Sequence, residues 1–185
     1  MTEMWSFQRA AGAFLVISVL PLAIGVYLFL SRNGIQGGVS RSSALFAWER
    51  GSFLTAVVLT AVGLMLLEGA IQETDGRVLA RVGASAYSLG AVLLVAAEAM
   101  SLAENATYSY PLIVIYVVLA FLGQAAIGGA LLQSNLSPVW IGWTTVVWNL
   151  GLLIVLLIVT PGDIYYPFAH HLMPLLIGIP LLWRG

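Results

Sequence analysis

Residues 78–105 read VLARVGASAYSLGAVLLVAAEAMSLAEN, and this stretch decides the fold. The part from 78 to 103 is long and apolar enough to cross the roughly 30 Å hydrocarbon core of a bilayer, which takes about 20 residues of α-helix. Small residues recur on one face of this predicted helix: Gly83, Ala86, Gly90, Ala97 and Ser101. In lipid, such a face lets a second helix approach closely. We therefore predict a membrane-spanning helix that packs centrally in a bundle.

Glu98 is the acidic residue inside this apolar stretch. An ionised carboxylate at that depth costs a few kcal/mol, so the group must be protonated, paired or in contact with water. One interpretation is a structural acid that is hydrogen-bonded to a facing helix. A second is a group that relays protons or contacts a ligand. A third is a span boundary that leaves Glu98 at the lipid headgroups.

The composition agrees with a membrane protein over the whole chain. Of 185 residues, 61% are hydrophobic and 8% are charged, whereas soluble domains carry about 25% charged residues. We expect residues 1–185 to form a single helical-bundle domain embedded in a lipid bilayer. The net charge of -1 and the absence of a basic run argue against nucleic acid as a partner.

Missing residue types narrow the choice of cofactor. The sequence has no cysteine and no lysine, which argues against an iron–sulfur cluster and against a retinal Schiff base. Its two histidines, His170 and His171, are adjacent. They cannot supply two axial haem ligands from facing helices within one copy. We predict no metal site and no catalytic residue, and the sequence leaves any other cofactor open.

Further apolar runs complete an all-α, polytopic bundle of six transmembrane helices. The predicted spans are 11–30, 53–71, 78–103, 111–132, 139–159 and 164–183. Pro21 is expected to kink the first span by freeing the carbonyl of Ile17. Pro111 and Pro138 are expected to open the fourth and fifth spans.

Charged residues outside these runs are assigned to the membrane surface. We place Glu49 and Arg50 at the interface beside Trp48, which would act as an anchor. A solvated ion-pair cluster is expected in the turn between the second and third spans. Its members are Glu68, Gln72, Glu73, Asp75, Arg77 and Arg81.

Six crossings would put both termini on one side of the membrane. In that topology the tryptophans at 5, 140, 143 and 183 map to the terminal side, and the tyrosines at 108, 110, 165 and 166 map to the other. Two such aromatic belts are typical of membrane interfaces. Arginines divide almost evenly between the sides, so their bias is weak. We expect a multi-pass protein of the cell membrane with both termini in the cytoplasm.

The same topology gathers the candidate site residues, which are Glu98, Gln124, Asn149, His170 and His171. They are candidates for ligand binding or proton relay. Adjacent histidines point about 100° apart on a helix, so at most one can face Glu98. A His–Glu hydrogen bond, an interfacial histidine, and a haem or metal ligand across a homodimer remain alternatives. Gln124 and Asn149 are interpreted as interhelical hydrogen-bonding groups in preference to ligand contacts.

The segment 131–143, LLQSNLSPVWIGW, resembles a helix–turn–helix connection found in small uncharacterised bacterial multipass membrane proteins. The likeness covers about the last third of the chain. Those proteins have six or seven helices and no assigned function. The resemblance implies a helical bundle and no particular activity.

The sequence is compatible with three functional hypotheses. The first is a binding or scaffold protein, an accessory subunit that takes an apolar or amphipathic ligand or docks beside other membrane proteins or a second copy. The second is a small proton-coupled transporter that uses Glu98 with His170 or His171, although no internal repeat supports it. The third is an intramembrane enzyme that modifies lipid, with Glu98, Asp163 and the histidines as its acid–base groups.

Overall fold

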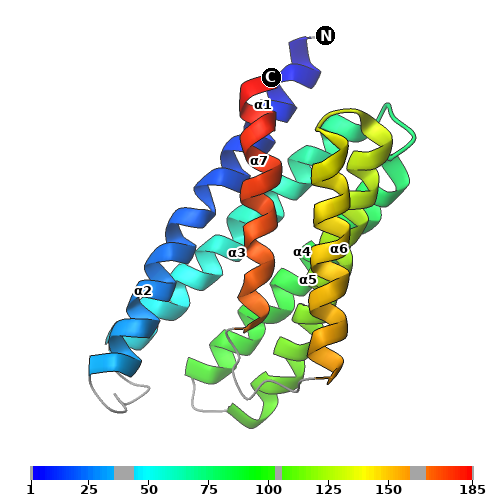
Figure 1. The fold of residues 1–185 in the computed structure, drawn as a ribbon. Coiled ribbons are helices and arrows are strands. Elements are labelled where there is room, and N and C mark those ends of the chain that lie inside the picture. Colours follow the sequence, from blue (N-terminus) through cyan, green and yellow to red (C-terminus); the bar gives the residue numbers. More distant parts are fainter. Residues whose placement is uncertain (1, 36–43, 103–105, 159–165, 185) are drawn as a thin grey trace.

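The computed structural model describes residues 2–35, 44–102, 106–158 and 166–184, and its regular structure there is entirely helical. In chain order the elements are α1 (Thr2–Ile17), α2 (Val19–Ile35), α3 (Ala44–Ile71), α4 (Arg77–Leu102), α5 (Ala106–Ser134), α6 (Val139–Ile158), the 3₁₀-helix η1 (Tyr166–His171) and α7 (Leu172–Arg184). Successive segments run up and down a bundle, and α1 begins at the end where α7 finishes (Figure 1). The prediction of an all-α bundle is confirmed.

Five helical segments of the described chain are long and apolar enough to cross a membrane, with α1 and α2 counted together as one. A further apolar segment near the end of the chain is shorter and is made of two helices, η1 and α7. α7 has 13 residues, or about 20 Å of α-helix, and the six residues of η1 add about 12 Å because a 3₁₀-helix rises about 2 Å per residue. The sum is close to the thickness of a bilayer core.

The first segment is interrupted at Ser18, between α1 and α2. Pro21 has no N–H to donate to the carbonyl of Ile17, so the helical ladder weakens at this point. The Ser18 hydroxyl instead donates to the carbonyl of Leu15 at 2.7 Å. The break therefore lies where the proline predicted a kink.

Two helix starts differ from the prediction. α3 begins at Ala44, well before the predicted start at 53, and so includes Glu49 and Arg50. α5 begins at Ala106, which puts Pro111 inside the helix and makes the prediction that Pro111 opens it wrong. A proline this close to a helix start removes one hydrogen bond, and the rest of the helix tolerates the loss.

The bundle consists of two halves. α1, α2, α3 and α7 pack together, α4, α5 and α6 pack together, and α3 against α4 is the main helix contact between the halves (Figure 1). Glycine permits close approach within each half. A Cβ on Gly83 would lie 2.6 Å from the carbonyl oxygen of Gly123, and one on Gly12 would lie 2.9 Å from that of Gly178. The predicted small-residue face of α4 thus packs on α5.

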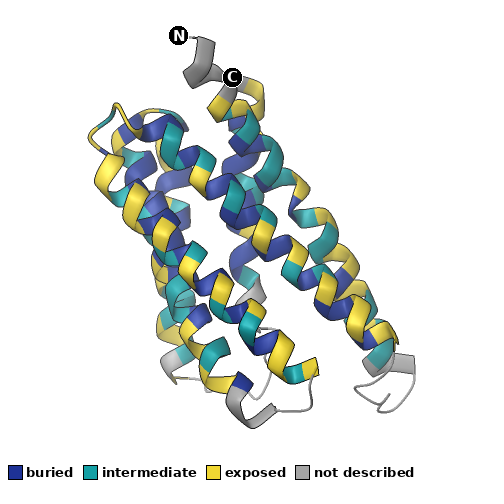
Figure 2. Cartoon of the chain, turned by 180° about the vertical axis from the view of Figure 1, so that it is seen from behind, coloured by how far each residue is buried: buried dark blue, intermediate teal, exposed yellow. Residues whose placement is uncertain are grey.

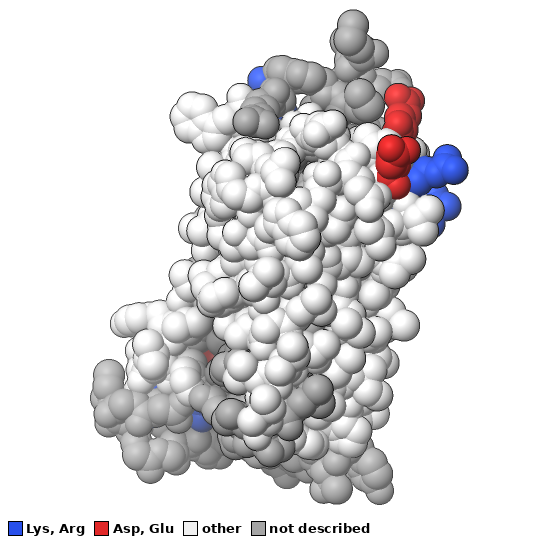
Figure 3. Space-filling view, turned by 45° about the vertical axis from the view of Figure 1, so that its right-hand side comes forward, with Lys and Arg blue, Asp and Glu red and all other residues white. Residues whose placement is uncertain are grey.

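Burial and charge follow the pattern expected of a bundle in lipid. Inward faces are buried and outward faces carry many exposed apolar side chains (Figure 2). On the face in Figure 3, charged side chains gather at one end, above a wide surface without charged side chains. Near the other end, the charged atoms visible between uncharged neighbours lie within a hollow.

Candidate functional site

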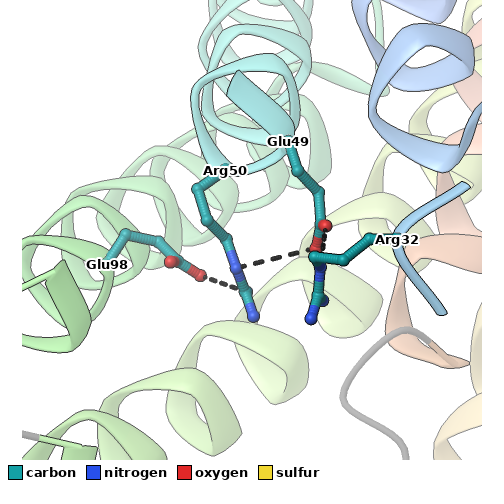
Figure 4. A network of polar contacts seen from close by, with 4 residues as sticks. All are labelled: Arg32, Glu49, Arg50 and Glu98. Carbon is teal, nitrogen blue, oxygen red and sulfur yellow. Dashed lines mark hydrogen bonds and ion pairs between the residues drawn. The ribbon is translucent and has the colours of Figure 1, made fainter. Parts of the chain in front are cut away.

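Four charged side chains from three helices meet inside the bundle, and we call them the ion-pair layer: Arg32, Glu49, Arg50 and Glu98 (Figure 4). Arg32 on α2 donates to both carboxylate oxygens of Glu49, at 2.8 and 3.2 Å. Arg50 donates from Nη1 to Oε1 of Glu98 at 2.8 Å, and its Nε lies 3.9 Å from Glu49. Two positive and two negative groups therefore balance, and the Arg50–Glu98 pair joins the two halves of the bundle.

The ion-pair layer is buried. The side chains of Glu49, Glu98 and Arg50 are 0%, 5% and 8% exposed. The ring of Phe46 packs against the guanidinium group of Arg50, 4.9 Å from its centre, in the manner of a cation–π contact. Trp48 is 71% exposed. The sequence predicts Glu49 and Arg50 at the membrane interface beside Trp48, and the structure adds that α3 turns both charged side chains into the bundle while Trp48 points outward.

Glu98 has its hydrogen bond with Arg50, so the proposed His–Glu pair is wrong. Its second oxygen, Oε2, is buried and has no hydrogen-bond partner among the described residues. A carboxylate oxygen in that state can accept one more donor, such as water or a ligand hydroxyl or amine. Among the predicted site residues, Glu98 therefore keeps chemical capacity beyond its structural bond.

The histidines belong to a second cluster, the His–Tyr layer: Thr60, Tyr87, Tyr116, His170 and His171. The hydroxyls of Tyr87 and Tyr116 lie 3.4 and 3.3 Å from Nε2 of His170. Nδ1 of His171 lies 3.5 Å from the hydroxyl of Thr60. All five side chains are at most 1% exposed. The layer ties α3, α4 and α5 to η1.

The local sequence explains why the histidines lie on a 3₁₀ turn. Pro174 cannot donate to the carbonyl of His170, so the α-helix cannot extend back through that residue. α7 accordingly starts at Leu172. The indole N–H of Trp148 on α6 donates to the carbonyl of Ala169 at 3.1 Å. This bond satisfies one backbone group of the irregular segment, as burial in an apolar setting requires.

The two layers are separate, which corrects the predicted single constellation. Tyr87 and Glu98 are both on α4, and their spacing in the sequence corresponds to about 16 Å along the helix axis. The prediction placed the five side chains within a few turns of depth and left a His–Glu hydrogen bond open, and this separation excludes that bond. In the structure, η1 carries His170 and His171 deeper into the bundle.

Gln124 and Asn149 are fully buried, but neither makes the interhelical hydrogen bond that we predicted. Asn149 donates from Nδ2 to the carbonyl of Thr145 in its own helix, at 2.8 Å. The amide atoms of Gln124 and Oδ1 of Asn149 have no hydrogen-bond partner among the described residues. Gly128, one turn from Gln124, packs against Thr145. The two amides therefore lie at a similar level of the α5–α6 pair.

Metal binding has no support in the described part of the chain, where no group of three or more His, Cys, Asp or Glu side chains could hold an ion. The rings of His170 and His171 lie 4.2 Å apart, centre to centre, and they contact tyrosine, threonine and Phe121. Asp163, a candidate acid–base group of the enzyme hypothesis, lies outside the described residues. Also outside the described side chains are Trp5, Tyr108, Tyr165 and Tyr166 of the predicted aromatic belts.

Sequence reasoning missed Arg32, Arg50, Tyr87 and Tyr116. A signal for Arg50 was present, because one face of α3 is buried at alternating spacings of four and three. Its members are Phe46, Arg50, Phe53, Val57, Thr60, Leu64, Leu67 and Ile71. This regular helical repeat runs through Arg50 without a break. It indicated that the helix begins before 53 and that Arg50 faces inward.

The charged turn between α3 and α4 contains the predicted ion pair. Nε of Arg81 lies 3.3 Å from Oε1 of Glu68, and the Arg81 side chain is 73% exposed.

Comparison of the chain with protein-family models, with curated proteins and with solved structures found no match. The function of the chain must therefore be inferred from the geometry of the two layers and of this turn.

Proposed function

We propose that this chain is a multi-pass protein of the cell membrane that acts as a binding or scaffold subunit and catalyses no reaction of its own. The observation that carries the proposal is the internal pairing of its buried charges. Arg50 bonds Glu98 at 2.8 Å across the two halves, and Arg32 bonds Glu49 at 2.8 Å. None of these four charged side chains lines either of two surface pockets on the described chain. Such pairing favours a structural role for these charged groups over a role in an active-site cavity.

Six crossings are part of this proposal. The five long apolar segments and the combined length of η1 and α7 support it. The cysteine-free sequence allows a direct test with single cysteines at exposed positions: Ala44→Cys at one end, and Gln72→Cys, Gln133→Cys and, near the end of the last helix, Trp183→Cys at the other. A membrane-impermeant maleimide added to intact cells should label only Ala44→Cys. Labelling of Gln72→Cys, Gln133→Cys and Trp183→Cys without Ala44→Cys would reverse the orientation, and labelling at both ends would contradict six crossings.

Membrane proteins are the partners that a scaffold of this kind would hold. Cross-linking in native membranes followed by mild solubilisation should recover a repeatable set of membrane proteins with this chain. The matched control is an unrelated six-span protein expressed at the same level. Recovery of only a monomer, or of the control's own set of proteins, would contradict the scaffold role.

A second candidate function, a proton-coupled carrier, is favoured by one specific observation. Oε2 of Glu98 is buried without a hydrogen-bond partner among the described residues, and the pair that Glu98 forms with Arg50 lies between the two halves. Intramembrane acids in such positions serve as proton sites in carriers. Proton flux into liposomes loaded with a pH-sensitive dye would distinguish the two functions. The scaffold proposal predicts no flux above protein-free liposomes. Flux that Glu98→Gln abolishes in a folded protein would establish the carrier instead.

The lipid-modifying enzyme has the least support. Its acid–base groups would be Glu98 and the histidines, but these lie in layers about 16 Å apart along α4. Tyr87, Tyr116 and Thr60 surround the histidines, and Arg50 holds Glu98. A shared substrate carbonyl or phosphate could not reach both layers at once.

A further inference from the structure

A groove of about 480 Å³ lies where α3 ends and α4 begins. Its lining residues are Glu68, Gln72, Arg77, Val78, Arg81 and Val82. The groove lies at the turn that joins the two helices, so in a membrane-embedded bundle it lies at the level of the lipid headgroups. Neither buried layer contributes to it. The groove is therefore a feature separate from the candidate site in the bundle interior.

Two arginines supply the positive side of the groove. Arg77 and Arg81 are one helical turn apart on α4 and lie on the same face. Arg81 is 73% exposed and makes one ion pair, with Glu68 at 3.3 Å. A guanidinium group has five N–H donors, so donors remain for an incoming anion. Paired guanidinium groups favour a phosphate, which each of them can bind through two parallel hydrogen bonds.

Acidic side chains limit which phosphate suits the groove. Glu68 lines it, and Glu73 and Asp75 are exposed on the same turn. Three acids against two arginines leave this end of the α3–α4 pair with a formal charge of −1. A purely anionic headgroup would be repelled by that excess. A zwitterionic headgroup, with an ammonium group beside its phosphate, complements both signs of charge.

An exposed apolar strip continues from the groove along α4. Val78 and Val82 line the groove and are 64% and 54% exposed, and Leu89 and Val92 farther along the helix are 57% and 65% exposed. Spacings of four, seven and three keep these residues near one face of the helix. Charged groups at the headgroup level and an apolar strip below them are the two surfaces that a phospholipid requires.

We propose that this groove binds the headgroup of an aminophospholipid of the phosphatidylethanolamine type. Arg77 and Arg81 hold its phosphate, and Glu68 accepts a hydrogen bond from its ammonium group. An acyl chain lies along Val78 and Val82. This proposal is independent of the scaffold function, because it holds for any role of the bundle in the membrane.

Native mass spectrometry of the purified full-length chain with defined lipids tests the proposal. The probes are phosphatidylethanolamine, phosphatidylglycerol, diacylglycerol and inorganic phosphate. We expect phosphatidylethanolamine to bind best, and Arg77→Gln and Arg81→Gln each to weaken its binding about fivefold, since one hydrogen-bonding partner contributes roughly 1 kcal/mol. The double variant should lose about 25-fold. Glu68→Gln should remove the preference for phosphatidylethanolamine over phosphatidylglycerol.

Arg9→Gln is the matched control. Arg9 is on α1 at the same end of the bundle, since a Cβ on Gly69 of α3 would lie 3.6 Å from the nearby Phe7, and it does not line the groove. The Arg9→Gln variant should bind phosphatidylethanolamine as tightly as the parent protein does. Unchanged binding by the double variant, or an equal loss in Arg9→Gln, would overturn the proposal. Displacement of the lipid by inorganic phosphate at equal concentration would also overturn it, because the groove would then be a simple anion site.

Discussion

The ion-pair layer and the His–Tyr layer share two helices, α3 and α4, yet they bury polar groups in different ways. In the ion-pair layer, Arg50 and Glu98 are charged groups whose burial is offset by each other. In the His–Tyr layer, Thr60 and Tyr87 are neutral groups that form hydrogen bonds with His171 and His170. Removing one partner strands a charge in the first layer but only a hydroxyl or a ring nitrogen in the second. The two layers should therefore differ sharply in their response to substitution.

Position explains the difference. The ion-pair layer lies near the end of the bundle where α4 finishes, and Arg32 remains 15% exposed. The cost of burying a charge falls toward the membrane interface, where long side chains reach water. The His–Tyr layer lies about 16 Å away, toward the start of α4. There Tyr87 and His170 have no exposed surface. A deep position favours neutral groups, because hydrogen bonds can satisfy them completely.

The largest effect is expected for Arg50→Leu. Removing this guanidinium leaves the buried carboxylate of Glu98 without its ion pair, and breaking a buried pair in this way costs about 3 to 5 kcal/mol. Equilibrium unfolding in mixed detergent micelles measures the loss. A change below about 1 kcal/mol would mean that Glu98 is already neutral in the native protein, and the charged character assigned to this layer would be wrong.

A smaller loss is expected for His170→Phe. A phenyl ring fills nearly the same volume but cannot bond the hydroxyls of Tyr87 and Tyr116, and unsatisfied buried hydroxyls cost about 1 to 3 kcal/mol. The same unfolding assay applies, with His170→Gln as a control that keeps a polar partner. If His170→Phe costs more than Arg50→Leu, the ranking of the two layers fails.

Tyr116→Phe should cost less again, about 0.5 to 1.5 kcal/mol. It deletes one hydroxyl and its hydrogen bonds while Tyr87 keeps a bond to His170. Phe121, which packs edge-on against the His170 ring at 5.6 Å, provides a packing control through Phe121→Leu. Equal losses for His170→Phe, Tyr116→Phe and Phe121→Leu would point to ring packing, and not hydrogen bonding, as the source of stability in this layer.

The smallest effect is expected for Glu68→Gln at the α3–α4 turn. Its ion pair with Arg81 is largely exposed, and such pairs contribute roughly 0 to 1 kcal/mol. Salt should reduce even this contribution, since exposed charges are screened. Unfolding at low and high ionic strength compares this pair with Arg50–Glu98. A salt-sensitive Arg50–Glu98 pair would show that the ion-pair layer is open to water.

Much of the fold could be predicted from the sequence because helices in lipid obey strong constraints on length and polarity. The apolar runs, the close packing at Gly83 and the need of Glu98 for a partner all derive from those constraints. The identity of that partner could not be derived in the same way. Placing Arg50 outside the second span rested on its charge, whereas a buried carboxylate on a facing helix makes an inward arginine favourable.

The second failure concerns the histidines. The sequence predicts a regular helix over 164–183 that carries His170 and His171 within a few turns of the depth of Glu98. Because of Pro174, the α-helix begins only at Leu172, and the residues before it form a 3₁₀-helix. Local propensity does not predict how deeply such a 3₁₀-helix inserts into the bundle. Tyr87 and Tyr116 lie within apolar runs, where tyrosine reads as an ordinary core residue. Only the packing of four elements shows that their hydroxyls meet.

The Arg50–Glu98 pair joins the two halves of the bundle, and each of its charges depends on the other. A double-mutant cycle with Arg50→Leu, Glu98→Leu and the combined variant, measured by equilibrium unfolding in micelles, tests it directly. We predict a coupling free energy of about 2 to 3 kcal/mol, with the combined variant more stable than Arg50→Leu alone. Additive losses, with a coupling near zero, would contradict the claim.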